Sequence, residues 1–257
     1  MDRIEAPLVV TSDIHLRDPN DSRAVLLEDL IERCIRGQVK HFVLNGDIFD
    51  FCFGMSGYFR RKFQRLGKCL ERLAASGTEV IFVEGNHEFA FSSMGWKGVR
   101  VVVHRDVPLT MPDGRLVRIT HGDLLYSDFW YRLLRLITKF PLSHYICSLV
   151  PGQWMDRWAL KYATHSRGKD DERELDHAAV LRSAASWLQD KQGDVGVFGH
   201  FHVPYAEQIA NRFLISVDSW DRPSVVMYRE GEFYRLFLED KQLVQKALEP
   251  SSYLASV

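Results

Sequence analysis

The chain has 257 residues, of which 46% are hydrophobic and 26% are charged, and its formal net charge at neutral pH is −1. This composition is that of an ordinary globular protein and excludes a disordered chain. The balanced charge gives no overall attraction to nucleic acid, so we expect no nucleic-acid partner. No uncharged apolar run reaches the roughly 18 residues of a transmembrane helix.

The N-terminus and the cysteines indicate a protein of the cytoplasm. Residues 1–7 have neither the apolar core nor the small-residue cleavage site of a signal peptide. The four cysteines show no CxxC spacing and fall mostly in apolar or helical contexts, which is typical of reduced packing residues. We therefore expect a cytoplasmic location.

The first hundred residues alternate between predicted strands and helices. Apolar runs at 8–10, 41–44 and 80–83 predict buried strands, and helical spacing predicts helices over 21–36 and 58–76. This β-α-β-α-β order favours parallel pairing, with helices on the sheet faces. Several short strands are predicted between Val99 and Ile119.

Between Phe129 and about Lys169 the sequence becomes helical, aromatic and basic. The helical spacing is broken at Pro141 and at Pro151, and the stretch contains eight aromatic residues and seven Lys or Arg against one acid. We predict a helical insertion over 129–169 within a single domain that covers 1–257. The rest is expected to contain a polar helix over about 171–191, strands near 195–198, 204–209, 212–217, 224–229 and 233–238, and a loose end at 250–257.

Side chains of the kinds that bind metals follow five of the apolar runs. Asp47 comes directly after the strand at 41–44, and Gly46 frees the backbone where that strand ends. We expect the five strand ends to form one site. The other four runs lead into Asp13 and His15, Asn86 and His87, His121, and His200 and His202.

This set of side chains has the chemistry that two adjacent divalent ions require. Nitrogen and oxygen ligands without thiolate suit Mn²⁺, Fe²⁺ or Zn²⁺, and the mostly hard donors favour manganese. Two such ions, about 3.5–4 Å apart, activate a bridging water and neutralise an attacked phosphoryl group. Taken singly, each motif is as well explained by a cap or a turn, but five in order are not. The predicted reaction is phosphoester or phosphoanhydride hydrolysis.

The ordered motifs resemble those of the calcineurin-like metallophosphoesterases. The resemblance implies an α/β (α+β) fold, a four-layer αββα sandwich, with a dinuclear site at one sheet edge. His87 would meet the substrate phosphate as a charged donor or proton donor, and Asp50 would orient a ligand; these two are the candidate catalytic residues. The motifs are Asp13-x-His15, Gly46-Asp47-x-x-Asp50, Gly85-Asn86-His87-Glu88, His121-Gly122-Asp123 and Gly199-His200-Phe201-His202.

The same resemblance divides the ligands between two ions, with Asp47 shared. One ion would be bound by Asp13, His15, Asp47 and His202. The other would be bound by Asp47, Asn86, His121 and His200.

A narrower resemblance concerns the insertion. A helical insertion after His121-Gly122-Asp123 and Asp128, and a closing strand followed by Trp220, resemble the UDP-2,3-diacylglucosamine pyrophosphohydrolases of lipid A biosynthesis. This implies a manganese-dependent, peripheral enzyme on the cytoplasmic face of the inner membrane. It would release UMP and leave 2,3-diacylglucosamine 1-phosphate, with the acyl chains under the insertion. The candidate substrate-binding residues are Asp128, for the sugar, and the basic residues Arg157, Lys161, Arg167 and Lys169.

Alternatives remain open at this level. His87 stands where that subfamily usually has arginine, and residues 166–173 depart from its polar pattern, so the substrate could be another phosphodiester or phosphomonoester, such as a cyclic nucleotide, a phosphoprotein or a different lipid. The insertion could simply be a helical hairpin packed on the sheet. A non-catalytic metal-binding scaffold for a membrane or protein partner is disfavoured, because every predicted ligand is present.

Overall fold

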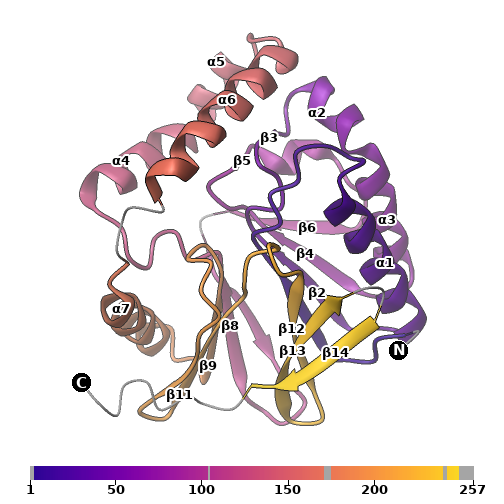
Figure 1. Cartoon of the computed structure of the whole chain (residues 1–257), viewed down its shortest axis with the longest axis vertical. Helices are drawn as coiled ribbons and strands as arrows, with labels where there is room; N and C mark the ends of the chain where they lie inside the picture. Colours follow the sequence, from indigo (N-terminus) through magenta and orange to yellow (C-terminus); the bar gives the residue numbers. More distant parts are fainter. Residues whose placement is uncertain (1–2, 104, 171–174, 240–241, 249–257) are drawn as a thin grey trace.

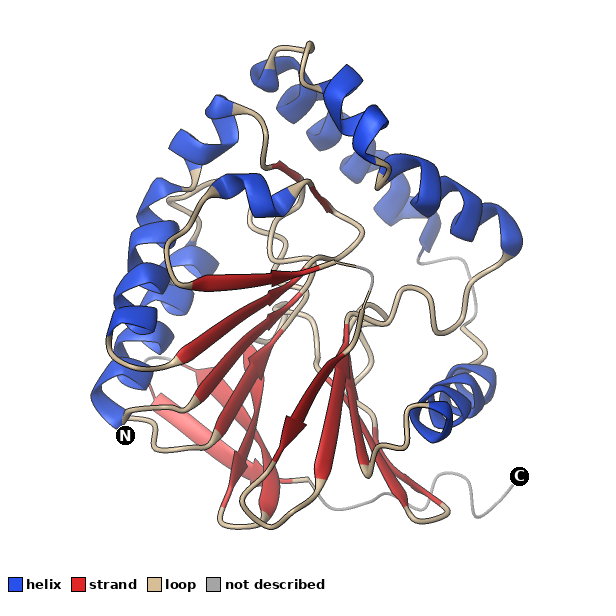
Figure 2. Cartoon of the chain, turned by 180° about the vertical axis from the view of Figure 1, so that it is seen from behind, coloured by secondary structure: helices blue, strands red, loops and turns tan. Residues whose placement is uncertain are grey.

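The computed structural model of the chain describes residues 3–103, 105–170, 175–239 and 242–248, without the side chains of 162–170, 239, 242 and 243. Two β-sheets pack face to face, and helices cover both outer faces (Figures 1 and 2). The α/β sandwich expected from the sequence is confirmed.

The larger sheet has seven strands. They are β1 (Leu8–Thr11), β2 (His41–Asn45), β4 (Glu79–Val83), β6 (Val99–Val102), β12 (Ser224–Arg229), β13 (Glu232–Glu239) and β14 (Gln242–Ala247). Their spatial order is β14-β13-β12-β1-β2-β4-β6. The segment from β1 to β6 is parallel, as the β-α-β-α-β order predicts, whereas β12 joins β1 in antiparallel fashion.

The smaller sheet has five strands in the order β10-β11-β9-β8-β7. They are β7 (Val107–Thr110), β8 (Leu116–Thr120), β9 (Val195–Phe198), β10 (Ala206–Ile209) and β11 (Arg212–Ser216). Strands β8, β9 and β11 are parallel to one another. The carboxyl ends of β8 and β9, both followed by predicted ligands, therefore lie at the same edge of this sheet.

Three apolar layers hold the sandwich together. Helices α1 (Ser22–Gly37) and α3 (Gln64–Ala75) cover the outer face of the larger sheet, and α7 (His177–Asp190) covers that of the smaller one. Burial of these side chains supplies the main stabilisation. The inter-sheet layer includes Val10, Val43, Ile81, Val117, Val197 and Ile215; the layer under α1 and α3 includes Leu27, Leu30, Phe42, Leu70 and Phe82; the layer under α7 includes Leu181, Leu188, Phe198 and Leu214.

The single helix predicted over 58–76 is two helices, α2 (Gly57–Lys62) and α3. The break is at Phe63, whose φ of −104° and ψ of 19° are not helical. Its buried ring packs on Phe49 with 4.2 Å between centroids. The change of direction lets α2 contact the insertion, where Tyr58 and Lys62 bind Asp156 at 2.7 and 2.8 Å.

Four short or terminal elements were not predicted: β3 (Cys52–Phe53), β5 (Glu88–Phe89), the 3₁₀ helix η1 (Phe91–Met94) and β14. Strands β3 and β5 pair only with each other, and two residues are too few for a periodic pattern. Of the helix predicted over 171–191, residues 171–174 lie outside the described residues, and α7 begins after the capping Asp176. The end expected to be loose, 250–257, also lies outside them.

The stretch from 129 to 170 forms three helices, α4 (Phe129–Thr138), α5 (Pro141–Cys147) and α6 (Gly152–Asp170). The breaks fall at the two prolines that the sequence indicates, and Pro141 occupies the first turn of α5. Both views place these helices across the end of the sandwich to which β2 and β4 point (Figures 1 and 2). None of the helices in the described part of the chain is long and apolar enough to cross a membrane.

Candidate metal centre

The predicted ligands follow the carboxyl ends of β1, β2, β4, β8 and β9, and the structure brings them together. Three overlapping groups have ligand atoms within 4.8 Å of one another. Asp47 belongs to two of the groups, as expected for a carboxylate shared by two ions. The groups are Asp13, His15 and His202; His15, Asp47 and His87; and Asp47, His121 and His200.

Five of these residues have a left-handed backbone. The φ angles of Asp13, His15, Asp47, His200 and His202 lie between 51° and 71°. This conformation is unfavourable for residues other than glycine by about 1–3 kcal/mol, and such residues cluster at functional sites. The backbone therefore turns sharply after β1, β2 and β9, three of the five strands that lead into the site.

Two glycines leave room for the central carboxylates. A Cβ atom on Gly85 would lie 2.3 Å from Oδ1 of Asp47, and one on Gly199 would lie 2.4 Å from Oδ2 of Asp13. Both distances are far below van der Waals contact. Any larger residue at either position would displace a predicted ligand.

The first group has the arrangement of an ion site. Nε2 of His15 lies 3.4 Å from Nε2 of His202, which in turn lies 3.4 Å from Oδ1 of Asp13. Two imidazole nitrogens and a carboxylate oxygen thus converge on one point. Nδ1 of His15 is buried and has no hydrogen-bond partner among the described residues.

The second group is built around Asp47 and His121. Nε2 of His121 lies 3.3 Å from Oδ2 of Asp47 and 3.0 Å from Oδ1 of Asn86. The other ring nitrogen donates to the carbonyl of Asn45 at 2.9 Å, so Nε2 is the nitrogen that can face an ion. The ring of His200 lies 5.3 Å from that of His121.

The charges of the predicted ligands suit divalent cations. Burial lowers the pKa of His15 and of His200 to about 4, so both rings are neutral ligands at neutral pH. Burial opposes charge on His121 as well, but the Asp47 carboxylate raises its pKa to about 10. Although burial opposes ionisation of Asp47, His121 and His87 hold its pKa well below the usual range. The residues present therefore fit two divalent ions in both ligand type and charge.

His87 and Asp50, the candidate catalytic residues, lie beside this centre. Nδ1 of His87 donates to the carbonyl of Asp50 at 2.6 Å, and its backbone N–H donates to Oδ1 of Asp47 at 3.0 Å. The Asp50 carboxylate accepts a 2.8 Å bond from Nε of Arg17 and lies 3.7 Å from Nδ1 of His15. Asp50 thus holds the candidate phosphate-binding ring through its carbonyl, while its carboxylate lies near a candidate ligand without a hydrogen bond to it.

Glu88 is part of the motif quoted from the sequence, but its role is visible only in the structure. Its fully buried carboxylate accepts hydrogen bonds from the backbone N–H groups of Asp47, Gly85 and Phe49 at 2.9 to 3.1 Å. It therefore ties the loop that carries Asp47 to the loop that carries Asn86. A single sequence offers no pattern that identifies this role.

An apolar cavity of about 640 Å³ opens beside the metal centre. Asp50, Asn86 and His87 form its polar end, and the insertion supplies most of the rest. Such a volume and lining are typical of a small-molecule site. The insertion residues are Tyr131, Leu134, Arg135 and Thr138 of α4, Cys147 of α5, Val150, and Met155, Trp158 and Ala159 of α6.

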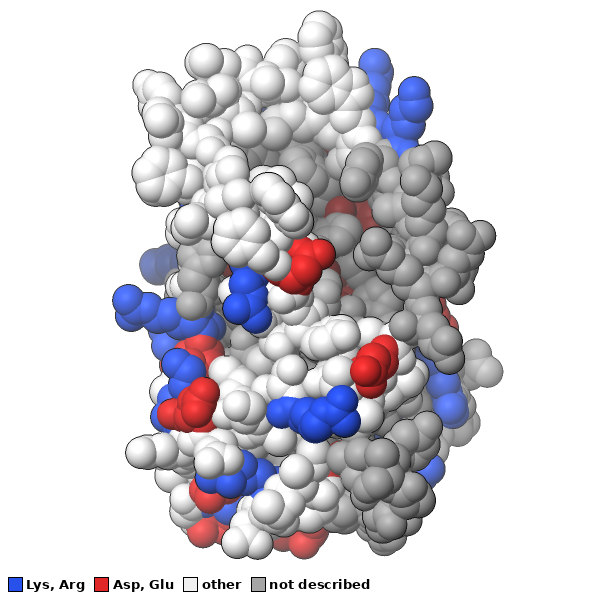
Figure 3. Space-filling model, turned by 90° about the vertical axis from the view of Figure 1, so that its left-hand side faces the viewer, with Lys and Arg blue, Asp and Glu red and all other residues white. Residues whose placement is uncertain are grey.

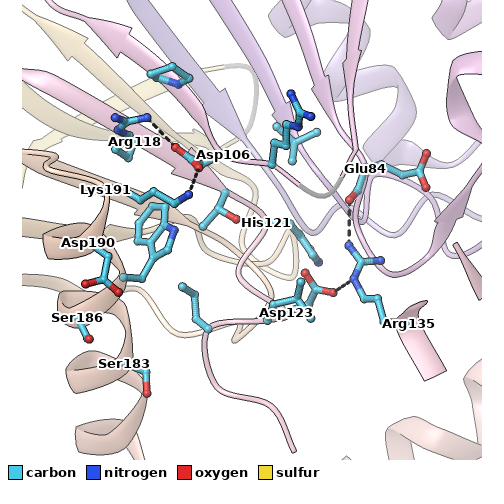
Figure 4. A pocket seen from close by; sticks show the side chains of 17 residues that line it. Glu84, Asp106, Arg118, His121, Asp123, Arg135, Ser183, Ser186, Asp190 and Lys191 are labelled. Atoms are coloured by element: carbon cyan, nitrogen blue, oxygen red, sulfur yellow. Dashed lines mark hydrogen bonds and ion pairs between the residues drawn. The ribbon is translucent and has the colours of Figure 1, made fainter. Parts of the chain in front are cut away.

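A second cavity, of about 740 Å³, is lined by His121 and mostly by polar or charged residues (Figure 4). It is bounded by α7 and by an ion-paired group in which Asp106 binds Arg118 at 2.9 Å and Lys191 at 3.3 Å. Of the four cations that line it, Arg118 and Lys191 thus share one carboxylate. Arg135 lines both cavities and forms an ion pair with Asp123 between them.

The substrate-binding candidates are more dispersed than the predicted ligands. Asp128 is exposed and caps α4 through a 2.7 Å bond from the N–H of Tyr131. Arg157 and Lys161 are exposed on α6 and are not among the residues that line the apolar cavity. The side chains of Arg167 and Lys169 lie outside the described residues. These assignments stay predictions.

Comparisons with known proteins agree with this geometry. The chain is 27% identical over 252 residues to a UDP-2,3-diacylglucosamine hydrolase of Pseudomonas fluorescens (strain SBW25), covering 94% of this chain and 98% of the relative. It is 29% identical to the enzyme of the same name from Porphyromonas gingivalis, covering 78% and 84%. The structure of Chaetomium thermophilum Vps29 has a TM-score of 0.51 at 10% identity, covering 93% of this chain and 95% of Vps29, which is a likeness of fold alone.

The family assignment rests on a match that contains all of the predicted ligands in order. The calcineurin-like phosphoesterase model matches residues 6–204, which span the motifs from Asp13 to His202 and include the whole insertion. The chain belongs to the calcineurin-like phosphoesterase family, and it is a metal-dependent phosphoesterase.

Proposed function

We propose that the protein hydrolyses the pyrophosphate bond of UDP-2,3-diacylglucosamine, releasing UMP and leaving 2,3-diacylglucosamine 1-phosphate. The observation that carries this proposal is the apolar cavity, whose polar end is formed by Asp50, Asn86 and His87. A lipid with a phosphorylated headgroup has the same polarity, with acyl chains on one side and a phosphoryl group on the other. The names of the relatives support the same substrate.

At the phosphoryl group, the predicted ligands and His87 have different roles. Asp47 and the surrounding imidazoles would hold the ions, which would polarise phosphoryl oxygens and make water a stronger nucleophile. His87 lies at the cavity end of the site, with its side chain one-third exposed. Burial disfavours its charged form, but the Asp47 carboxylate and the Asp50 carbonyl raise its pKa, so a protonated ring can donate to the phosphate or the leaving group.

The proposal includes manganese as the native ion. The ligand set has no sulfur: two carboxylates and one amide oxygen suit Mn²⁺, and the four imidazoles also accept Fe²⁺ or Zn²⁺. Metal-free protein reconstituted with each ion separately, and assayed on one substrate, tests the preference. Highest turnover with a metal other than manganese would contradict it.

We further propose that the insertion contacts the cytoplasmic face of the inner membrane. Its helices expose many large apolar side chains, and the upper part of the face in Figure 3 carries few charged residues compared with the lower part. Such a surface fits the acyl boundary of a lipid bilayer. The exposed residues include Phe129, Trp130, Leu136, Phe140, Leu149 and Trp154. Flotation with liposomes measures this contact, and a protein that stays wholly unbound would contradict it.

Product analysis tests the proposed reaction directly. Manganese-loaded protein is mixed in detergent with UDP-2,3-diacylglucosamine, and mass spectrometry follows UMP and the lipid monophosphate. Rapid, metal-dependent appearance of both supports the proposal. Their absence, while bis(p-nitrophenyl) phosphate is still cleaved, would overturn the substrate and leave the dinuclear hydrolase.

Another phosphoester is the second candidate. It is favoured by His87, which stands where the resembling subfamily usually has arginine, and by the exposure of Arg157 and Lys161 away from the cavity. A panel of cyclic nucleotides, phosphopeptides and phospholipids assayed beside the nucleotide-sugar lipid distinguishes the two candidates.

A further inference from the structure

The helix α4 packs on the rest of the protein through its charged face. Its buried side chains are those of Arg135 and of Lys139, the residue at its C-terminal cap, which are four positions apart and so lie on one face. The apolar side chains Phe129, Trp130, Leu134, Leu136 and Ile137 are all more than half exposed. An amphipathic helix on a globular protein ordinarily buries the opposite face.

Lys139 binds the loop that carries Asn86 and His87. Its side chain and that of Glu84 are each 1% exposed, and Nζ lies 2.8 Å from Oε1 of Glu84. The same ammonium donates to the carbonyl of Gly85 at 2.7 Å and to the carbonyl of Glu88. The three bonds thus fix the loop on both sides of Asn86 and His87.

Arg135 joins this loop to the one that follows β8 (Figure 4). Its guanidinium donates to the carbonyls of Gly85 and Glu84 at 3.2 and 3.3 Å and forms a buried ion pair with Asp123. Asp123 lies two residues after His121, whose Nε2 is 3.0 Å from Asn86. One side chain of the insertion therefore spans the segments that hold two ligands of the same predicted ion.

We propose that Arg135 and Lys139 are positioning residues for the phosphoesterase reaction: they fix the separation of Asn86, His87 and His121 and align the apolar cavity with the metal centre. The residues of α4 that line the cavity, Tyr131, Leu134 and Thr138, are within one turn of the two cations. Movement of α4 is thereby transmitted to the metal loops. A displacement of about 1 Å at a reacting group costs on the order of a hundredfold in rate.

The test uses a substrate that does not need the cavity. The full chain and its Arg135→Lys variant are assayed on bis(p-nitrophenyl) phosphate, and manganese binding is measured by calorimetry. Lysine keeps the charge but offers one nitrogen in place of the three, Nη1, Nη2 and Nε, that reach Gly85, Glu84 and Asp123. We expect kcat to fall about tenfold or more with KM within twofold, and the weaker of the two manganese-binding steps to weaken further. Arg132→Gln, an exposed change on the same helix, is the matched control and should change neither measurement.

A second variant avoids leaving a buried carboxylate unpaired. Lys139→Met combined with Glu84→Gln removes the ion pair while keeping the volume, and it should also lower kcat on the small diester. Unchanged kcat and manganese binding in both variants, with any loss confined to KM for the lipid, would overturn the proposal and leave the cations as anchors of the insertion. The comparison on the small diester depends only on the family's reaction, so it remains valid if UDP-2,3-diacylglucosamine is not the substrate. If the proposed substrate is wrong, the unmodified protein itself does not hydrolyse the lipid.

Discussion

Replacement of His87 by alanine distinguishes a phosphate-binding ring from a metal ligand. The ring belongs to one of the three groups that could hold an ion, together with His15 and Asp47. However, its Nε2 lies 3.8 Å from Oδ2 of Asp47, farther than the corresponding nitrogen of His121, and the ring lines the apolar cavity, which that of His121 does not. We therefore expect His87→Ala to retain two bound ions and to lose turnover.

The size of the loss follows from the contacts that the ring can make. A hydrogen bond to a charged group contributes about 1.5–3 kcal/mol, and about 1.4 kcal/mol corresponds to a tenfold change in rate. Loss of one such bond to the phosphoryl group predicts a decrease in kcat of roughly 10- to 150-fold. If His87 also protonates the leaving group, the loss reaches about 10²- to 10⁴-fold and is larger for an alkyl leaving group than for p-nitrophenol.

The assay measures kcat on an aryl and an alkyl phosphodiester, and the metal content of each protein by mass spectrometry. His41→Ala is the control, because His41 pairs with Glu79 at the start of β2, at the opposite end of the strand from the metal centre. Loss of one ion in His87→Ala would refute the reasoning and make His87 a ligand. Equal loss on both diesters would support the phosphate contact of His87 and exclude its role as proton donor to the leaving group.

Three further outcomes follow from the same geometry. Asp47→Ala removes the carboxylate shared by two groups, so both ions and all turnover should be lost; full activity with two ions would exclude the shared role. Because the pKa of His121 is about 10 without metal, this ring is protonated at pH 8 and must release its proton to bind an ion. Affinity should therefore rise with pH up to about 10, and calorimetry in buffers of different ionisation enthalpy should detect proton release, whereas proton-neutral binding would contradict this. Trp158→Ala enlarges the apolar cavity and should raise KM for the amphiphile several-fold without affecting bis(p-nitrophenyl) phosphate; an equal effect on both would argue against a lipid site.

The residues of the candidate metal centre were predictable because each one follows a strand that is recognisable in the sequence. A buried strand is a short apolar run, so the polar residue that ends it is conspicuous, and the carboxyl ends of parallel strands meet at one edge. The sequence therefore identified the residues from Asp13 to His202 that the structure brings together. It could not reveal the left-handed backbone at those residues or the three N–H groups held by Glu88, since both depend on loop geometry.

The insertion was predictable as helices but not in its orientation. The prolines at 141 and 151 mark the breaks, because their rings restrict the backbone locally. Which face of α4 meets the protein depends on partners outside the helix, such as Glu84 and Asp123. The count of seven cations in this stretch therefore did not separate Arg135 and Lys139, which are buried in ion pairs, from Arg157 and Lys161, which are exposed.

That α4 buries its charged face and exposes its apolar one has a physical reason if the cavity binds an amphiphile. A helix that buried its apolar face on the sheet would leave none to line a cavity or to meet a bilayer. With the apolar residues of α4 kept outward, its attachment depends on polar contacts, which are stable in a buried setting only when every charge is paired. The structure supplies these partners in Glu84, Asp123 and the carbonyls of Gly85 and Glu88, all next to metal-binding segments. The same contacts that free the apolar face for lipid thus join the insertion to the groups that act on phosphate.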